Sequence, residues 1–263
     1  MGWIATALGL YLLFVAFLFV MQRQMLYLPS GQLPDPAASG VPGLGAVTVP
    51  TKDGLQLTHW YRAPAAPDGP VVAVLHGNAG HIGHRIGKYW PLLQAGFGLL
   101  LIEYRGYGGN PGSPSETGLT EDARSALAWL MEEDVAPGRI VLYGESLGTA
   151  PAVRAAAAQA RGSLGPTAVP FAGLVLEAPF TSIADVAQHH YWYVPVRWLL
   201  RDPWEVAPDI GAIAAPLLVV HGERDRVVPA RFGKRLYELA AEPKEALFPP
   251  DGDHNGLLED PAL

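Results

Sequence analysis

The sequence contains no cysteine. This absence excludes disulfide bridges, thiolate ligands for a metal and a cysteine nucleophile. It is compatible with a reducing compartment but does not establish one. Charged residues are also few, at 16% of the chain, and the formal net charge is −7 without any run of basic residues. Nucleic acid is therefore not expected as a partner, because its binding needs clustered lysine or arginine.

Signals for cofactors are missing as well. The chain has no G-x-x-x-x-G-K-[S/T] segment that would cradle nucleotide phosphates. His76, His81 and His84 lie close together, but no carboxylate flanks them and no second ligand cluster follows. We therefore expect neither a cofactor nor a metal. The sequence gives no indication of the oligomeric state.

The N-terminus carries the longest uncharged stretch. Residues 2–21 are apolar, and about 20 helical residues span roughly 30 Å, the thickness of a bilayer's hydrocarbon core. Trp3 and Tyr27 would then lie near the two interfaces. We expect an uncleaved single-pass anchor. A secretory signal is the alternative, but no basic region precedes the stretch and no small-x-small site follows it; a buried core helix is a third reading. Arg23, the one nearby positive charge, favours a cytoplasmic catalytic domain without settling the side.

The rest of the chain is expected to form a spacer and one domain. Residues 29–45 are rich in proline, glycine and alanine, which favours a flexible linker. Residues 46–263 suffice for a single α/β core. Short apolar runs alternate there with helical stretches, which predicts a mostly parallel sheet with helices on both faces. The expected strands are 46–49, 55–61, 71–75, 99–104, 140–143, 174–177, 217–221 and 246–248, and the expected helices are 85–95, 120–133, 149–160 and 230–240.

Residues 180–213 interrupt this alternation and are rich in aromatic side chains. We expect them to form a short lid that lines an apolar pocket. The alternative is a scaffold helix whose aromatic side chains belong to the core, because such side chains bury well anywhere. On the lid reading, Tyr191 and Trp192 contact the substrate. Tyr107, in a glycine-rich loop, is a further candidate, with packing in a turn as its alternative.

The most informative stretch is Gly144–Gly148, which reads G-x-S-x-G. It follows an apolar, β-branched run and precedes an alanine-rich helical stretch, which is the strand–turn–helix setting that this motif needs. Ser146 is therefore predicted as a nucleophile. The N–H group of Leu147, at the start of the helix, is predicted to stabilise an oxyanion.

A serine nucleophile needs a base and a group that orients the base. Asp225 follows the expected strand 217–221, and His254 is the only histidine after it. The order Ser, Asp, His, with each residue after a strand, is that of hydrolases with the G-x-S-x-G turn. Alternatively, Asp225 is a turn or helix-capping residue and His254 a solvated loop residue. Glu223 and Glu177 are fallback acids. The second oxyanion donor is expected in the loop after strand 71–75, at Asn78.

Six motifs occur in order along most of the chain, and together they resemble the α/β-hydrolase superfamily. The closest likeness is to its membrane-tethered serine hydrolases, which are related to the dienelactone hydrolase and prolyl oligopeptidase branch. The resemblance implies an α/β-hydrolase fold with Ser146, Asp225 and His254 as the triad and Leu147 and Asn78 as oxyanion donors. The motifs are Leu75–Gly80, Tyr104–Gly108, Gly144–Gly148, Leu176–Ser182, His221–Asp225 and Gly252–Asn255.

Members of this group usually carry a helix after the histidine loop. Here the chain ends nine residues after His254, and Pro261 disfavours a helix across it. We therefore expect that helix to be missing here, either because the protein lacks it or because the sequence is truncated. The predicted function is a membrane-anchored serine hydrolase that cleaves an ester or thioester of a small or lipid-like acyl substrate. A peptidase of the oligopeptidase type and a catalytically silent scaffold that binds a lipid or protein are the alternatives.

Overall fold

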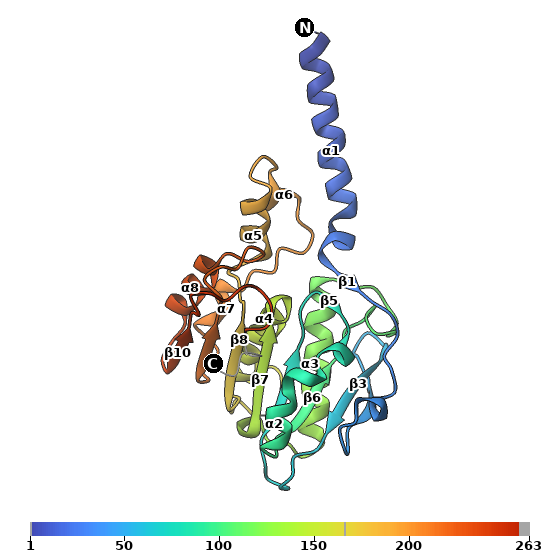
Figure 1. Ribbon diagram of the computed structural model, residues 1–263, viewed down its shortest axis with the longest axis vertical. Coiled ribbons are helices and arrows are strands. Elements are labelled where there is room, and N and C mark those ends of the chain that lie inside the picture. The colour runs from blue at the N-terminus through green and yellow to red at the C-terminus, as the bar shows by residue number, and fades with distance from the viewer. Residues whose placement is uncertain (1, 166, 258–263) are drawn as a thin grey trace.

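The computed structural model describes residues 2–165 and 167–257. The helix expected to be missing around Pro261 lies outside these residues. A long helix, α1 (Gly2–Leu26), projects from an α/β domain (Figure 1). Within the described ranges, α1 is the single helix long and apolar enough to cross a membrane, with a mean hydropathy of 2.5.

Eight strands form the central sheet, in the order β10-β9-β8-β7-β4-β6-β3-β2. The two pairs β2–β3 and β3–β6 are antiparallel and the other neighbours are parallel. This confirms the predicted mostly parallel sheet. The strands are β2 (Gly45–Pro50), β3 (Gln56–Arg62), β4 (Val71–Leu75), β6 (Gly98–Ile102), β7 (Ile140–Glu145), β8 (Gly173–Glu177), β9 (Leu217–Val220) and β10 (Lys244–Leu247).

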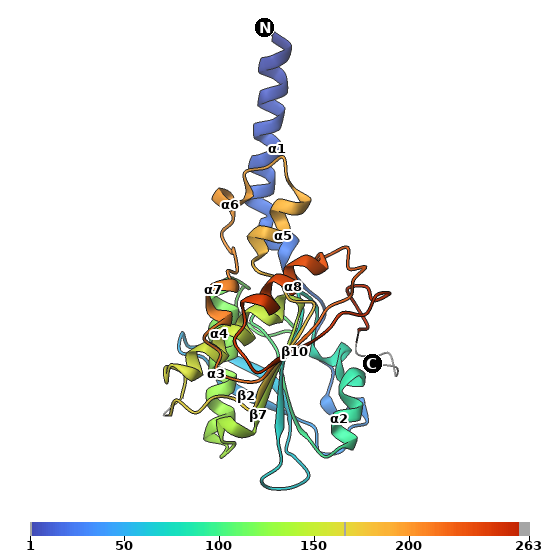
Figure 2. The same ribbon diagram turned by 90° about the vertical axis from the view of Figure 1, so that its left-hand side faces the viewer.

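Helices cover both faces of the sheet. The helices α3 (Glu116–Glu132) and α4 (Thr149–Ala160) lie on one side and α2 (Trp90–Gln94) on the other (Figure 2). The central strand β4 supplies Val71, Ala73 and Leu75 to one core and Val72 and Val74 to the other. Successive side chains of a strand point to opposite faces, so an all-apolar strand joins two cores. The helix α8 (Ala230–Leu239) follows β9.

The segment expected to be a flexible spacer packs on the domain instead. Its first residues form β1 (Leu28–Pro29), which pairs in parallel with β5 (Ala79–Gly80), and a short turn of 3₁₀ helix, η1 (Pro36–Ser39), follows. Val41 and Leu44 are buried in the core beneath it. The prediction failed because it rested on the proline and glycine content of the segment. The burial of two apolar side chains and the backbone pairing of β1 with β5 are enough to fix its position.

Residues 180–213 form three short helices, α5 (Ile183–His190), α6 (Val196–Leu199) and α7 (Ala207–Ile210). Ser182 caps α5 through the N–H of Asp185. Both views show α5 and α6 above the domain, beside the lower part of α1 (Figures 1 and 2). The aromatic side chains divide, because Trp204 is fully buried whereas Trp192 and Trp198 are exposed. We call residues 183–200 the cap.

Candidate active site

A sharp turn holds Ser146 at the carboxyl end of β7. The turn (Ser146–Gly148) joins β7 directly to α4. Ser146 has a φ of +48°, a left-handed backbone conformation that is strained for a residue with a side chain. A Cβ atom at Gly148 would lie 1.9 Å from the carbonyl oxygen of Leu75. Only glycine therefore lets β4 and the turn approach so closely, and this packing holds the serine in place.

The structure brings Ser146, His254 and Asp225 together. The Nε2 atom of His254 lies 3.1 Å from Ser146 Oγ, and its Nδ1 atom lies 2.7 Å from Asp225 Oδ2. Asp225 follows β9 and His254 follows β10, so all three side chains lie at the carboxyl edge of the sheet, where open α/β sheets bind ligands. Asp225 accepts the Nδ1 proton, which leaves Nε2 free to accept the proton of the serine hydroxyl.

Asp225 is buried and accepts four hydrogen bonds. Its Oδ1 atom receives the N–H groups of Val227 and Val228, each at 2.8 Å, and Oδ2 receives His254 and His221. Burial alone would raise the pKa of Asp225, but the hydrogen bonds from His221 and His254 outweigh it and hold that pKa below its ordinary value. The side chain is therefore a carboxylate at neutral pH.

The fallback acids have other partners. Glu177 is buried and bonds to Lys88 and Tyr143, and Glu223 pairs with Lys234. Among the hydrogen bonds of the described residues, neither glutamate reaches His254. Asp225 is thus the acid that the geometry favours.

Sequence reasoning missed His221. This fully buried residue ends the β9 region, and its Nε2 atom lies 3.1 Å from Asp225 Oδ2 and 2.8 Å from the carbonyl oxygen of Val228. The contacts fix the position of the acid. A histidine at the end of a buried strand, four residues before a candidate acid, is a polar group that needs a partner, and this signal was available in the sequence.

Asn78 is held by the N-terminal segment. Its carbonyl oxygen accepts hydrogen bonds from the N–H of Leu28, at 2.9 Å, and from the hydroxyl of Tyr107, at 2.8 Å. Its side-chain amide donates to the carbonyl oxygen of Leu26 at 3.0 Å. Asn78 and Leu147 line the same cavity as Ser146. The carbonyl and side chain of Asn78 are thus engaged with the end of α1 and with β1.

Tyr107 lies elsewhere than predicted. Its ring is fully buried against His76 and Tyr104, and it is not among the residues that line the cavity at Ser146. Burial raises its pKa. The hydroxyl of Tyr107 donates to the carbonyl oxygen of Asn78 and so supports that loop. Packing within a turn, the alternative given for this residue, describes it better than substrate contact. The glycine-rich loop offered no means to distinguish the two readings.

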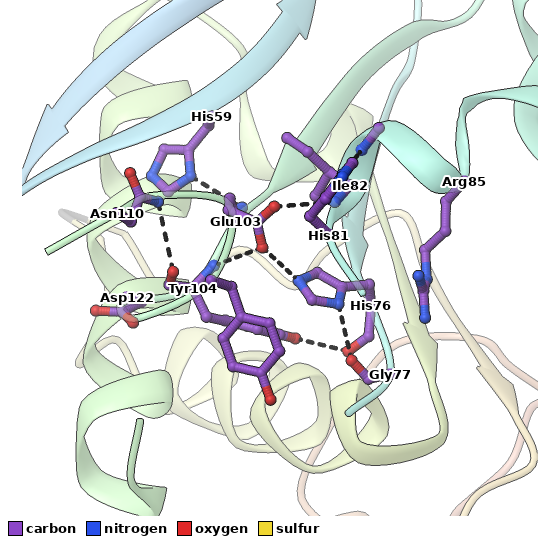
Figure 3. A network of polar contacts seen from close by, with 12 residues as sticks. His59, His76, Gly77, His81, Ile82, Arg85, Glu103, Tyr104, Asn110 and Asp122 are labelled. Atoms are coloured by element: carbon purple, nitrogen blue, oxygen red, sulfur yellow. Dashed lines mark hydrogen bonds and ion pairs between the residues drawn. The ribbon is translucent and has the colours of Figure 1, made fainter. Parts of the chain in front are cut away.

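A buried polar network fixes the loop after β4 (Figure 3). Glu103 accepts from the Nε2 atom of His76, at 2.8 Å, and from the backbone N–H of Ile82, at 2.9 Å. Its own N–H donates to Nδ1 of His59. The carboxylate thereby joins the loops that follow β4 and β6. Rigid supports of this kind keep a catalytic loop in a defined geometry.

A cavity of about 370 Å³ opens above Ser146. Its floor includes Ser146, Leu147 and Asn78, one wall is the cap with its helix α5, and the opposite wall is the last part of α1. Tyr191 lines it as predicted, but Trp192 does not, because that side chain is 77% exposed and is not among the lining residues. The size lies within the range of small-molecule sites, and the lining is mostly aliphatic and aromatic.

A second, polar cavity of about 550 Å³ is lined by His254. Its lining includes Arg85, Lys88, Glu145 and Glu177. Lys88 pairs with both glutamates and Arg85 pairs with Glu145. Burial would raise the pKa of Glu145, but the two cations lower it on balance. His254 thus lines the polar cavity, whereas its hydrogen-bond partner Ser146 lines the apolar one.

Comparison with known proteins shows which family the chain resembles. Residues 66–205 match the protein family described as serine aminopeptidase, S33. The chain is 43% identical to the uncharacterised protein Rv2307c of Mycobacterium tuberculosis, over 92% of this chain and 83% of the relative. It is 35% identical to a zebrafish (Danio rerio) protein named lysophosphatidylserine lipase ABHD12, over 70% of this chain and 51% of that protein.

Solved structures show the same fold. An esterase of Pyrococcus furiosus, Pf2001, superposes with a TM-score of 0.65 at 18% identity, covering 87% of this chain and 91% of the esterase. An esterase of Rhodococcus, RhEst1, superposes with a TM-score of 0.62 at 19% identity, covering 82% and 94%. At such identities the likeness concerns the arrangement of strands and helices.

Proposed function

Because the chain belongs to the serine aminopeptidase S33 family of the α/β-hydrolase superfamily, we propose that it is a membrane-anchored serine hydrolase. Its substrate is an ester or thioester of a lipid-like acyl group. The observation that carries the proposal is the chain of contacts from Ser146 through His254 to Asp225 at the floor of an apolar cavity.

The reaction begins when Ser146 Oγ attacks the carbonyl carbon of the bound ester. His254 Nε2 takes the hydroxyl proton, and Asp225 stabilises the resulting imidazolium through Nδ1. The N–H groups of Leu147 and Asn78 stabilise the oxyanion, assisted by the partial positive charge at the start of α4. His254 then protonates the leaving oxygen or sulfur as the carbonyl re-forms.

Water completes the cycle. His254 accepts a proton from a water molecule, whose oxygen attacks the acyl-enzyme carbonyl, and the proton returns to Ser146 Oγ as the acid departs. Asp225 remains a carboxylate throughout, because its pKa is held low. The polar cavity beside His254 suits both the incoming water and a hydrophilic leaving group.

The apolar cavity favours an acyl substrate over a peptide. Leu18, Val186 and Leu199 lie on its walls, and such side chains leave the polar backbone of a peptide without hydrogen-bond partners. The family description names an aminopeptidase, so peptide hydrolysis is the second candidate. A relative named a lipase and neighbours named esterases agree with the first.

The test uses the full-length protein in detergent with a fluorophosphonate probe and p-nitrophenyl esters. Ser146→Ala is expected to abolish labelling and to lower kcat by about 10⁴–10⁶-fold. Ser125→Ala, on α3, is the matched control and should behave as the wild type. Near-normal ester hydrolysis by folded Ser146→Ala protein would refute the proposal. Turnover of aminoacyl anilides with no turnover of esters would favour the peptidase.

A further inference from the structure

One face of α1 contacts the protein, although the helix is apolar all round. Tyr11, Val15, Leu18, Gln22 and Leu26 recur at intervals of three or four residues, the spacing of one helix face. Val15, Leu18 and Leu26 are partly buried and line the cavity above Ser146. By contrast, Leu13, on another face, is 70% exposed and is not a lining residue.

Specific contacts hold α1 against the cap. The hydroxyl of Tyr11 donates to the carbonyl oxygen of Tyr193 at 2.7 Å, and the ring of Phe14 stacks on the same tyrosine. Further down, the side chain of Gln22 accepts the N–H of Arg201 at 2.7 Å. Tyr11 and Gln22 are separated by about 17 Å of helix at 1.5 Å per residue, so the contact extends along roughly half of a membrane-spanning length.

The lower end of α1 is fixed more firmly. Arg23 makes two hydrogen bonds to the buried carboxylate of Asp202, at 2.7 and 3.0 Å. Tyr27, directly after the helix, is buried and its hydroxyl accepts from the indole of Trp204 at 3.1 Å. A bidentate arginine–carboxylate pair with a buried partner orients both groups. The face of α1 toward the cavity is therefore set by protein contacts.

The exposed residues around this assembly suit a lipid surface. Trp192 and Trp198 on the cap are 77% and 89% exposed. Arg197 on the cap pairs with Asp185, and Arg201, directly after the cap, lies over the ring of Phe19. Aromatic and basic side chains together are typical of segments that lie among lipid headgroups. The remaining faces of α1 are exposed and apolar. A membrane that surrounds α1 would thus adjoin the wall of the cavity.

We propose that α1 is part of the substrate site, in addition to being an anchor. Its inward face forms a wall of the acyl-binding cavity, and the long acyl chain of the ester lies between α1 and α5 with its carbonyl carbon at Ser146. This inference rests on the proposed function. It makes the membrane segment a determinant of chain length, with Leu18 as the residue that the chain contacts at the middle of the wall.

Cavity filling tests the proposal in the full-length protein. Leu18→Trp inserts bulk into the cavity, whereas Leu13→Trp makes the same change on an exposed face. The measured quantity is the ratio of kcat/KM for p-nitrophenyl palmitate to that for p-nitrophenyl acetate. We expect Leu18→Trp to lower this ratio about tenfold or more, as a steric block does in a close-fitting pocket, and Leu13→Trp to leave it within about twofold. An unchanged ratio in Leu18→Trp, or an equal fall in both variants, overturns the proposal.

Photocrosslinking supplies a test that needs no cavity variant. A long-chain alkyl fluorophosphonate with a terminal diazirine is attached to Ser146 and then irradiated, and the crosslinked peptide is identified by mass spectrometry. We expect crosslinks to residues 15–26 and to α5. Crosslinks confined to the polar cavity around Lys88 would overturn the inference. If the wild-type protein neither reacts with the probe nor cleaves either ester, the proposed function itself fails, which is a separate outcome.

Discussion

Asp225→Asn is the substitution that tests the proposed mechanism most sharply. The carboxylate makes two kinds of contact, each through one oxygen. Oδ1 accepts the backbone N–H groups of Val227 and Val228, whereas Oδ2 accepts His254 and His221. An asparagine can keep its carbonyl oxygen on the backbone N–H groups, so the loop should retain its conformation. Its NH₂ group then takes the place of Oδ2.

The substitution is expected to change which nitrogen of His254 carries the proton. An amide NH₂ group at the position of Oδ2 donates to Nδ1 of His254, so the imidazole proton moves to Nε2. Nε2 then faces Ser146 as a donor and has no lone pair for the hydroxyl proton. The imidazolium also loses its anion. In the best-studied serine protease the same change lowers kcat about 10⁴-fold, which corresponds to about 5 kcal/mol of activation free energy.

The assay is turnover of a p-nitrophenyl ester by full-length protein in detergent, with thermal unfolding as the check on folding. Asp251→Asn is the matched control, because Asp251 is exposed in the same region and pairs with Arg224. We expect near-wild-type turnover from the control. A loss of less than about tenfold in folded Asp225→Asn protein would show that another group orients His254. If Glu177→Gln instead caused the large loss of turnover, the acid would be assigned to Glu177, at the end of β8.

Two further predictions concern stability and location. Burial lowers the pKa of His59 to about 4. Between that value and the ordinary histidine pKa of about 6.5, only the unfolded chain is protonated at this residue. The free energy of unfolding should therefore fall by about 2 kcal/mol from pH 7 to pH 5. His59→Asn keeps an acceptor for the N–H of Glu103, and the free energy of unfolding in denaturant should depend less on pH in this variant than in the wild type. An equal dependence on pH in the two proteins would contradict this. Full-length protein should remain with membranes after carbonate extraction, whereas its release would exclude a spanning α1.

The sheet was predictable because its signals are local. Strands β4 and β7 are apolar, β-branched runs bounded by glycine or a turn, and such runs alternate with helical stretches along the chain. The closeness of Ser146, Asp225 and His254 was predictable by the same route, because the carboxyl ends of parallel strands meet at one edge of the sheet. Position after a strand therefore predicts proximity in space.

Side chains whose role depends on long-range packing were not predictable. Trp192 and Trp204 lie twelve residues apart in one aromatic-rich segment, yet one is exposed and the other fully buried beside Tyr27. Their surroundings differ because α1 returns to this segment from the far end of the sequence. The packing of Val41 and Leu44 was missed for a similar reason, since composition reports the average character of a segment and two apolar contacts determine its conformation.

The prediction of which side of the membrane holds the domain rested on a residue that makes such a long-range contact. Arg23 was the charge that favoured a cytoplasmic domain, but it pairs with the buried Asp202. An internal ion pair of an arginine cannot be inferred from the sequence around it, and a charge neutralised by a protein partner carries little information about orientation. The prediction of a cytoplasmic domain therefore stays a prediction, and the charge on which it rested is accounted for by the fold.

The proposed double role of α1, as anchor and as wall of the substrate site, has a physical reason for being invisible in the sequence. A helix that faces water on one side shows its buried face as an apolar stripe. A helix in lipid shows no stripe, because a leucine satisfies lipid and protein neighbours equally well. Leu13 and Leu18 are the same residue in the same uncharged run, and only the structure places one of them above Ser146. If α1 lines the substrate cavity, removing it to obtain a soluble enzyme would also remove a wall of the site that such an enzyme needs.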